Sequence, residues 1–142
     1  MTVLRTRRNQ RKYNAYMAHR PKGCDFCQIQ EGHAQFLKET ESFKIIHNRF
    51  PYAYWDDQTV ADHLMVVPKE HTGSLTSFTP DQAVEYLALI SDYENNGYHV
   101  YARAVKSVSR TITHQHTHLI KGKGKPKWFV VQMSKPYILI AR

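Results

Sequence analysis

The 142-residue chain has the length of one domain, and 42% hydrophobic with 23% charged residues is an ordinary globular composition. No apolar run approaches the roughly 20 residues that cross a bilayer, and no apolar segment follows the basic N-terminus. We therefore expect no membrane contact, no secretory signal and a cytoplasmic location.

The first predicted segment is a basic arm over residues 1–22, with a short helix at most. It holds seven Lys or Arg and no acid, and residues 95–142 hold nine and no acid, within a net charge of +8. Basic ends predict a polyanionic partner, either nucleotide phosphates or a nucleic-acid backbone. A solvated, disordered arm is the alternative for residues 1–20.

The rest of the chain, residues 23–142, is predicted to form a single domain. Two apolar stretches flanking a polar turn predict a β-hairpin over residues 36–47. A further strand over residues 63–67 is expected to end at Pro68, which cannot donate a ladder hydrogen bond in a strand interior.

The clearest predicted element is a helix over residues 80–94. Thr79 can cap it, Pro80 suits its first position and Gln82 completes a capping box. Its apolar face is expected to comprise Ala83, Val84, Leu87, Ile90 and Ser91.

The C-terminal part predicts only strands, which are expected at residues 98–105, 111–120, 127–133 and 137–141. Strands, then one helix, then strands predict an α+β domain with an antiparallel sheet and the helix on one face.

Three histidines alternate within the predicted strand 111–120, at His114, His116 and His118. Residues two apart in a strand share a face, so neighbouring imidazoles would lie about 6 to 7 Å apart. One interpretation is a solvent-exposed polar face. The other is a functional site, because histidine is the usual general base, nucleophile or metal ligand near neutral pH.

Several ordered blocks of the sequence resemble the histidine-triad family. Its signature, His-x-His-x-His and two apolar residues, corresponds to His114-Gln115-His116-Thr117-His118-Leu119-Ile120. Its earlier blocks correspond to residues 36–43, 48–52 and 63–71, the last reading His-Leu-Met-Val-Val-Pro-Lys-Glu-His. Several blocks in order are far more specific than one motif. The resemblance implies an HIT-like α+β fold with about five antiparallel strands, a short N-terminal helix or arm, and homodimerisation.

The resemblance also implies an enzyme, a nucleotide hydrolase or nucleotidyl transferase acting at a nucleoside α-phosphate. A purine nucleotide or dinucleoside polyphosphate is the expected substrate. By the resemblance, His116 would form a nucleotidyl-histidine, His118 would support the leaving group, and His63 would lie beside it. Asn48 would contact the ribose and Ile46 would line the base pocket.

The sequence departs from the family pattern beside the expected phosphate site. Ser109-Arg110-Thr111 stands where the family usually has Gly-Gln-Ser/Thr, and Arg103 stands where it usually has Asn. Thr111 fits the pattern, and both arginines add positive charge while keeping hydrogen-bond donors, so all three are candidate nucleotide-binding residues. An insert over residues 54–60 is a further departure. The alternative function is a nucleotide or nucleic-acid binding module with weak or no catalysis.

The only two cysteines form the pair Cys24-Asp25-Phe26-Cys27. A single CxxC motif can indicate a zinc site or redox chemistry, or it can occur by chance. The resemblance to a zinc-binding, CxxC-containing branch implies a closed structural zinc site, which has four protein ligands and no open position. Its ligands here would be Cys24, Cys27, His71 and His114.

Overall fold

The computed structural model describes residues 5–127, 130–134 and 137–141. The first four residues of the predicted basic arm, and residues 128–129 of the strand predicted at 127–133, lie outside these residues. The helices described are α1 (Arg7–Ala18), α2 (Asp25–Gln28), the 3-10 helix η1 (Leu75–Ser77) and α3 (Pro80–Asn95). None of the described helices has the length and apolar character that crossing a membrane requires.

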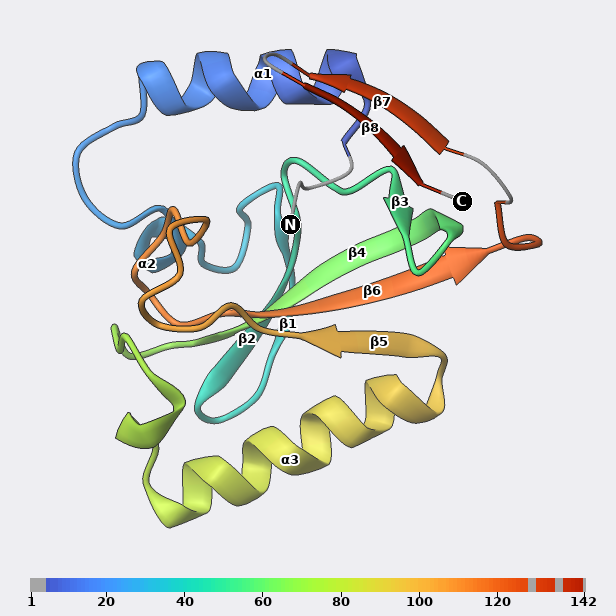
Figure 1. The fold of residues 1–142 in the computed structure, drawn as a ribbon. Helices are drawn as coiled ribbons and strands as arrows, with labels where there is room; N and C mark the ends of the chain where they lie inside the picture. The colour runs from blue at the N-terminus through green and yellow to red at the C-terminus, as the bar shows by residue number, and fades with distance from the viewer. Residues whose placement is uncertain (1–4, 128–129, 135–136, 142) are drawn as a thin grey trace.

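The main sheet is antiparallel and has six strands, in the order β1-β2-β4-β6-β5 with β3 paired to β4 (Figure 1). Its strands are β1 (Phe36–Glu39), β2 (Phe43–His47), β3 (Tyr54–Trp55), β4 (Gln58–Pro68), β5 (Tyr98–Tyr101) and β6 (Thr117–Lys123). Strands β7 (Val130–Ser134) and β8 (Tyr137–Ala141) form a separate two-stranded sheet. The predicted α+β class and the hairpin over residues 36–47 are confirmed.

The sheet has more than five strands because the insert over residues 54–60 folds back on itself as a β-hairpin. Asp56 and Asp57 have φ angles of 49° and 59°, the left-handed conformation that a tight two-residue hairpin turn requires at both central positions. The insert therefore adds β3 and extends β4 toward the N-terminus beyond the predicted start at His63.

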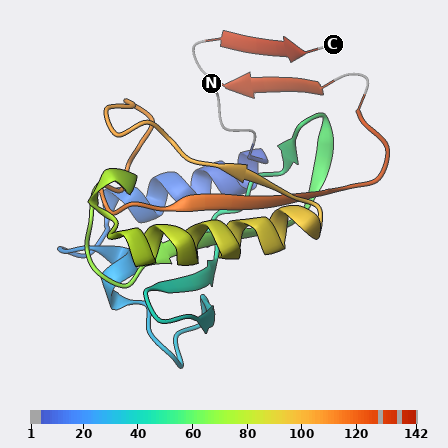
Figure 2. The same cartoon turned by 90° about the horizontal axis from the view of Figure 1, so that it is seen from below.

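Helices cover both faces of the sheet. Figures 1 and 2 show α3 on one face and α1 on the opposite face. Side chains of the strands alternate between two buried clusters, so Leu64 and Val66 pack on the α3 side and Met65 and Val67 on the other. This two-sided burial explains why β4 reads as a continuous apolar run.

Helix α3 has the predicted cap but a different buried face. Thr79 and Gln82 form the capping box. The residues packed on the sheet are Tyr86, Leu89, Ile90 and Tyr93, whereas Val84 and Leu87 are 68% and 58% exposed. The predicted face was therefore wrong except at Ile90, because the tyrosines of the helix fill the space over Phe43 and Tyr98.

Helix α1 is longer than the single turn expected in the basic arm. The side chain of Thr6 caps it by accepting from the Asn9 backbone N–H. Tyr13 and Tyr16 then pack on Phe50, with ring centroids 5.5 and 5.4 Å apart. Tertiary packing thus fixes a helix whose own periodicity is weak.

Strand β6 begins later than predicted, at Thr117. The antiparallel register pairs Val66 with Thr117, so continuing the ladder by two more pairs would bring Pro68 opposite Gln115. Proline has no N–H for the ladder. The Gln115 backbone N–H instead donates to Thr72, and the carbonyl of Pro68 lies 3.0 Å from the His114 ring. Residues 111–116 therefore run outside the sheet.

Candidate active site and metal centre

The predicted catalytic histidines lie together on the sheet face opposite α3. Leu119 belongs to the cluster under α3, and the hydroxyl of Thr117 lies 2.7 Å from that of Tyr86. His116 and His118 alternate with these residues and so lie on the other face. His118 pairs with Met65 on β4, two residues from His63, which brings the three imidazoles into one group.

His116 is held as a neutral imidazole with one free nitrogen. Its Nδ1 lies 2.9 Å from the backbone carbonyl of His114. Because a carbonyl can only accept, Nδ1 carries the proton and Nε2 carries the lone pair. Burial lowers the pKa of His116, so the ring stays neutral near pH 7. A neutral imidazole with a bare Nε2 is a competent nucleophile.

A second hydrogen-bond chain fixes the tautomers of His63 and His118. The backbone N–H of Tyr52 donates to Nδ1 of His63 at 3.2 Å, so His63 is protonated at Nε2. That Nε2 lies 2.9 Å from Nδ1 of His118. His118 therefore accepts at Nδ1 and carries its own proton on Nε2, where it is a donor. The side-chain amide nitrogen of Asn48 lies 3.1 Å from the same Nε2 atom of His63.

The surroundings of this pair keep both rings uncharged. Burial is the main cause, and it lowers the pKa of His63 to about 3 and the pKa of His118 well below its ordinary value. Arg5 adds to both shifts through its positive charge. The row of imidazoles thus carries lone pairs and N–H donors at neutral pH rather than positive charge.

A cavity of about 620 Å³ opens over these histidines, within the size range of small-molecule sites. His116 and His118 line it together with apolar side chains, among them Phe26, Ile29 and Ile112. Helix α1 lines it from the other side through Gln10, Tyr13, Asn14, Tyr16 and Met17. The cavity offers an apolar wall for a base and polar groups for a phosphate.

Four of the five predicted nucleotide-binding residues line this cavity: Asn48, Arg103, Arg110 and Thr111. Ile46 does not. It is fully buried and packs in the core with Phe26, Ile29 and Met65 beneath the cavity. The hydroxyl of Thr111 accepts from the Tyr13 hydroxyl at 3.1 Å, so α1 contacts the predicted phosphate-binding segment directly.

The side chain of Arg110 makes most of its hydrogen bonds to residues of its own loop. Its Nη2 donates to the carbonyls of Gly73 and Thr113 at 2.9 and 2.7 Å and to the side chain of Gln115 at 3.1 Å. Its Nε donates to the carbonyl of Ile112 at 3.3 Å. The side chain therefore ties together the segment that leads into the histidine row and holds it against the loop after β4.

Among the cavity residues that the sequence did not indicate as site residues are Arg5 and Tyr52. Tyr52 is 5% exposed, and its ring packs on His63 and His118 with centroids 4.5 and 5.7 Å apart. Arg5 reaches the cavity from the residues just before α1. The spacing of Tyr13, Tyr16 and Met17 was the one available signal that an apolar helix face packs against the domain.

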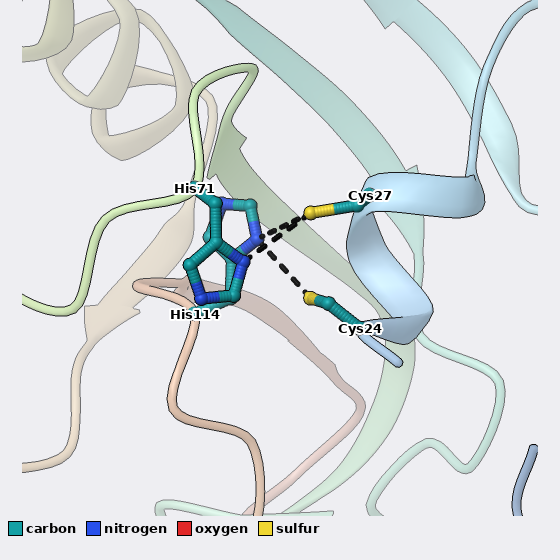
Figure 3. Close-up of side chains that lie close together, drawn as sticks. All are labelled: Cys24, Cys27, His71 and His114. Carbon is teal, nitrogen blue, oxygen red and sulfur yellow. Dashed lines mark hydrogen bonds between the residues drawn. The ribbon is translucent and has the colours of Figure 1, made fainter. Parts of the chain in front are cut away.

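The four predicted metal ligands converge from three segments (Figure 3). Cys24 immediately precedes α2 and Cys27 lies within it. His71 and His114 approach from the loops after β4 and before β6. The four ligand atoms lie within 4.8 Å of one another, and three of the four Sγ–Nδ1 pairs are 3.3 to 3.5 Å apart. This group could hold a metal ion.

The donor set and its spacing fit tetrahedral zinc. Bonds of about 2.3 Å to sulfur and 2.0 to 2.1 Å to nitrogen put neighbouring S and N ligands about 3.6 Å apart in a tetrahedron. Nε2 of His114 lies 3.0 Å from the carbonyl of Pro68, which orients the ring so that Nδ1 faces the thiols. Four protein ligands leave no open position, so such a site is structural.

Comparison with known proteins shows that the chain is similar in sequence and in fold to proteins of one family. The chain is 29% identical over 113 residues to adenosine 5'-monophosphoramidase HNT1 of Candida albicans, covering 70% of each chain. Its fold is similar to that of a solved Hit-like protein, with a TM-score of 0.57, 20% identity and coverage of 71% of this chain and 100% of that one. It is also similar to the HIT family hydrolase of Legionella pneumophila Philadelphia 1, with a TM-score of 0.54, 20% identity and coverage of 80% and 98%. No family model matches the chain.

Proposed function

This chain belongs to the histidine-triad family, and from that premise we propose that it is a nucleotide hydrolase or nucleotidyl transferase acting at a nucleoside α-phosphate. The substrate class is a purine nucleotide or dinucleoside polyphosphate bound in the cavity over the histidine row. Homologous proteins at 27 and 29% identity bear the name adenosine 5'-monophosphoramidase, which agrees with chemistry at that phosphorus.

One observation carries the proposal: His116 presents a bare Nε2 because the carbonyl of His114 holds its Nδ1–H. In the first step Nε2 attacks the α-phosphorus and the bond to the leaving group breaks. The leaving atom departs with the electron pair, and the Nε2–H of His118, which His63 orients, donates a hydrogen bond to it. Water or another acceptor then cleaves the phosphorus–nitrogen bond and releases His116.

The buried, neutral imidazoles favour this chemistry in two ways. A neutral His116 can attack without losing a proton first, and burial keeps it neutral. The low-dielectric surroundings strengthen each hydrogen bond to the charge that develops on the phosphoryl group. Asn48 lies beside His63 and is the proposed ribose contact.

We also propose that the Cys24–Cys27–His71–His114 group holds a structural zinc ion. When bound, zinc would cross-link α2 to the loop after β4 and to the segment before β6. His114 is a member of this group, and its backbone carbonyl fixes the tautomer of His116. The metal centre and the nucleophile are therefore joined through one residue.

Nucleic acid is a second candidate partner. Four bases of α1 are exposed and no acid lies in the helix: Arg7, Arg8, Arg11 and Lys12. An acid-free basic helix beside a nucleotide cavity suits a phosphate backbone. Homodimerisation is also proposed, because Val84 and Leu87 leave an apolar strip exposed on α3.

The test is turnover of a panel of adenylated substrates by wild type, His116→Ala and His33→Ala, the last removing an exposed histidine that does not line the cavity. We expect activity in wild type and His33→Ala and a loss of at least about 1,000-fold in His116→Ala, as for other essential nucleophiles. Equal activity in all three proteins would rule out the proposed nucleophile. Nucleotide binding without any turnover would favour the binding-module alternative.

A further inference from the structure

We propose that Arg5 and Arg103 form an anion subsite on the His118 side of the cavity, and that this subsite binds the phosphate groups of the substrate's leaving group. The inference rests on the proposed function, because it assigns a leaving group to that reaction. It makes the residues just before α1 part of the substrate site.

A series of ring contacts shows in which order the side chains follow one another along the floor of the cavity. Phe26 packs on His116, His116 on His118 and His118 on Tyr52, with centroids 5.1, 5.1 and 5.7 Å apart. The guanidinium of Arg5 lies 5.4 Å from the Tyr52 ring centroid. Arg5 therefore stands beyond His118, at the end away from Phe26.

Tyr52 joins the two arginines. Arg5 lies over its ring, and Nη2 of Arg103 donates to its hydroxyl at 3.5 Å. A second aromatic ring, Tyr13, lies 4.3 Å from the Arg5 guanidinium, and Nε of Arg5 donates to the carbonyl of Phe50 at 2.9 Å. These contacts hold Arg5 over the cavity rather than in solvent.

The charge in this cavity is not balanced by acids. Four arginines line it, at positions 5, 49, 103 and 110. Among the described lining residues Asp25 is the one acid, and Arg20 lies 3.6 Å from it. Within the part of the chain that the structure describes, no salt bridge involves Arg5 or Arg103. Arg5 and Arg103 are half-buried, so a bound anion would form charge-assisted hydrogen bonds that are partly shielded from water.

The reaction geometry assigns this anion to the leaving group. In a phosphoryl transfer the attacking and leaving atoms lie roughly in line, so a group displaced by His116 departs away from it. His118 stands next along the floor and its Nε2–H donates a hydrogen bond to the departing oxygen, and Arg5 and Arg103 stand beyond it. The bond from phosphorus to the bridging oxygen breaks, and the departing polyphosphate leaves with the electron pair into this basic end.

A neutral amine leaving group would gain nothing from these arginines. The subsite therefore selects phosphoanhydrides over phosphoramidates, unlike the activity named in the Candida albicans relative. Arginine suits the role because its planar fork binds phosphate oxygens in pairs. The selectivity comes from the N-terminal segment as much as from the loop after β5, which carries Arg103.

The test compares kcat/KM for diadenosine tetraphosphate and adenosine 5'-phosphoramidate in Arg5→Met, Arg103→Met and the control Lys106→Met. Lys106 is exposed in the same loop as Arg103 and does not line the cavity. Losing one charge-assisted contact should lower kcat/KM for the tetraphosphate about 10- to 100-fold in either arginine variant. Turnover of the phosphoramidate should fall by a smaller factor than that of the tetraphosphate in Arg5→Met, and Lys106→Met should change neither.

A parallel measurement needs no catalysis: binding of inorganic tripolyphosphate to each folded variant, checked by circular dichroism. We expect weaker binding in both arginine variants and unchanged binding in Lys106→Met. Equal losses for both substrates, or unchanged tripolyphosphate binding in Arg5→Met, would overturn the subsite. If wild type turns over neither substrate, the proposed function fails, and tripolyphosphate binding alone decides the inference.

Discussion

Replacing His63 by glutamine should flatten the dependence of stability on pH. The folded protein keeps the pKa of His63 at about 3 against an ordinary value of 6.5, because the ring is 3% exposed. The unfolded chain binds a proton below pH 6.5 and the folded chain does not. The free energy of unfolding is therefore complete above pH 6.5 and falls as the pH is lowered from 6.5 toward 3.

The size of the effect follows from the two pKa values. At pH 5 the folded ring is still neutral, so the loss from His63 is about 2 kcal/mol, at about 1.36 kcal/mol per pH unit below 6.5. His118 contributes with the same sign. Glutamine does not titrate, yet its amide nitrogen can still donate to His118, so the variant retains a hydrogen bond at this position.

Urea unfolding of both proteins at pH 8 and pH 5, with equal metal loading, measures this difference. Effects of pH on the metal site are common to both proteins and cancel when the two pH differences are subtracted. Wild type should lose about 2 kcal/mol more than His63→Gln between the two pH values. Equal losses in the two proteins would refute the assignment of His63 as a buried neutral base.

Three further predictions concern the metal centre, the loop before β6 and the α3 surface. The purified protein should contain about one zinc ion per chain, and Cys24→Ser should lose it and melt at a lower temperature; a metal-free, equally stable wild type would contradict this. Arg110→Gln should lower the free energy of unfolding by about 1 to 3 kcal/mol, because carbonyls of the loop lose their donor; an unchanged urea midpoint would show that the contacts are dispensable. Leu87→Ser should convert a dimer into a monomer in sedimentation experiments, and a monomeric wild type would remove the proposed dimer.

Local sequence signals predicted the parts of the fold that local chemistry determines. Thr79, Pro80 and Gln82 define the start of α3 through hydrogen bonds within four residues, and the structure has that capping box. The period of two in the histidine row predicted that His116 and His118 share a face, although His116 lies just outside β6. The CxxC pair converges with His71 and His114 as the family resemblance implied.

Long-range packing explains what the sequence could not indicate. No local pattern shows that Arg5 reaches a cavity that is also lined by loops far along the chain, or that Tyr52 connects it to His118. The buried face of α3 follows the shape of the cluster around Phe43 rather than the hydropathy of the helix. Ile46 faces the core because the register of β2 against β4 places it opposite Met65.

The most direct test of the proposed mechanism locates the covalent intermediate. Wild-type protein is mixed with a substrate labelled at the α-phosphate, quenched without acid within one turnover and digested for mass spectrometry. We predict a nucleotidyl group on the peptide that contains His116, attached to that imidazole and labile to acid. A nucleotidyl group on another residue, or turnover without any adduct at His116, would contradict the account.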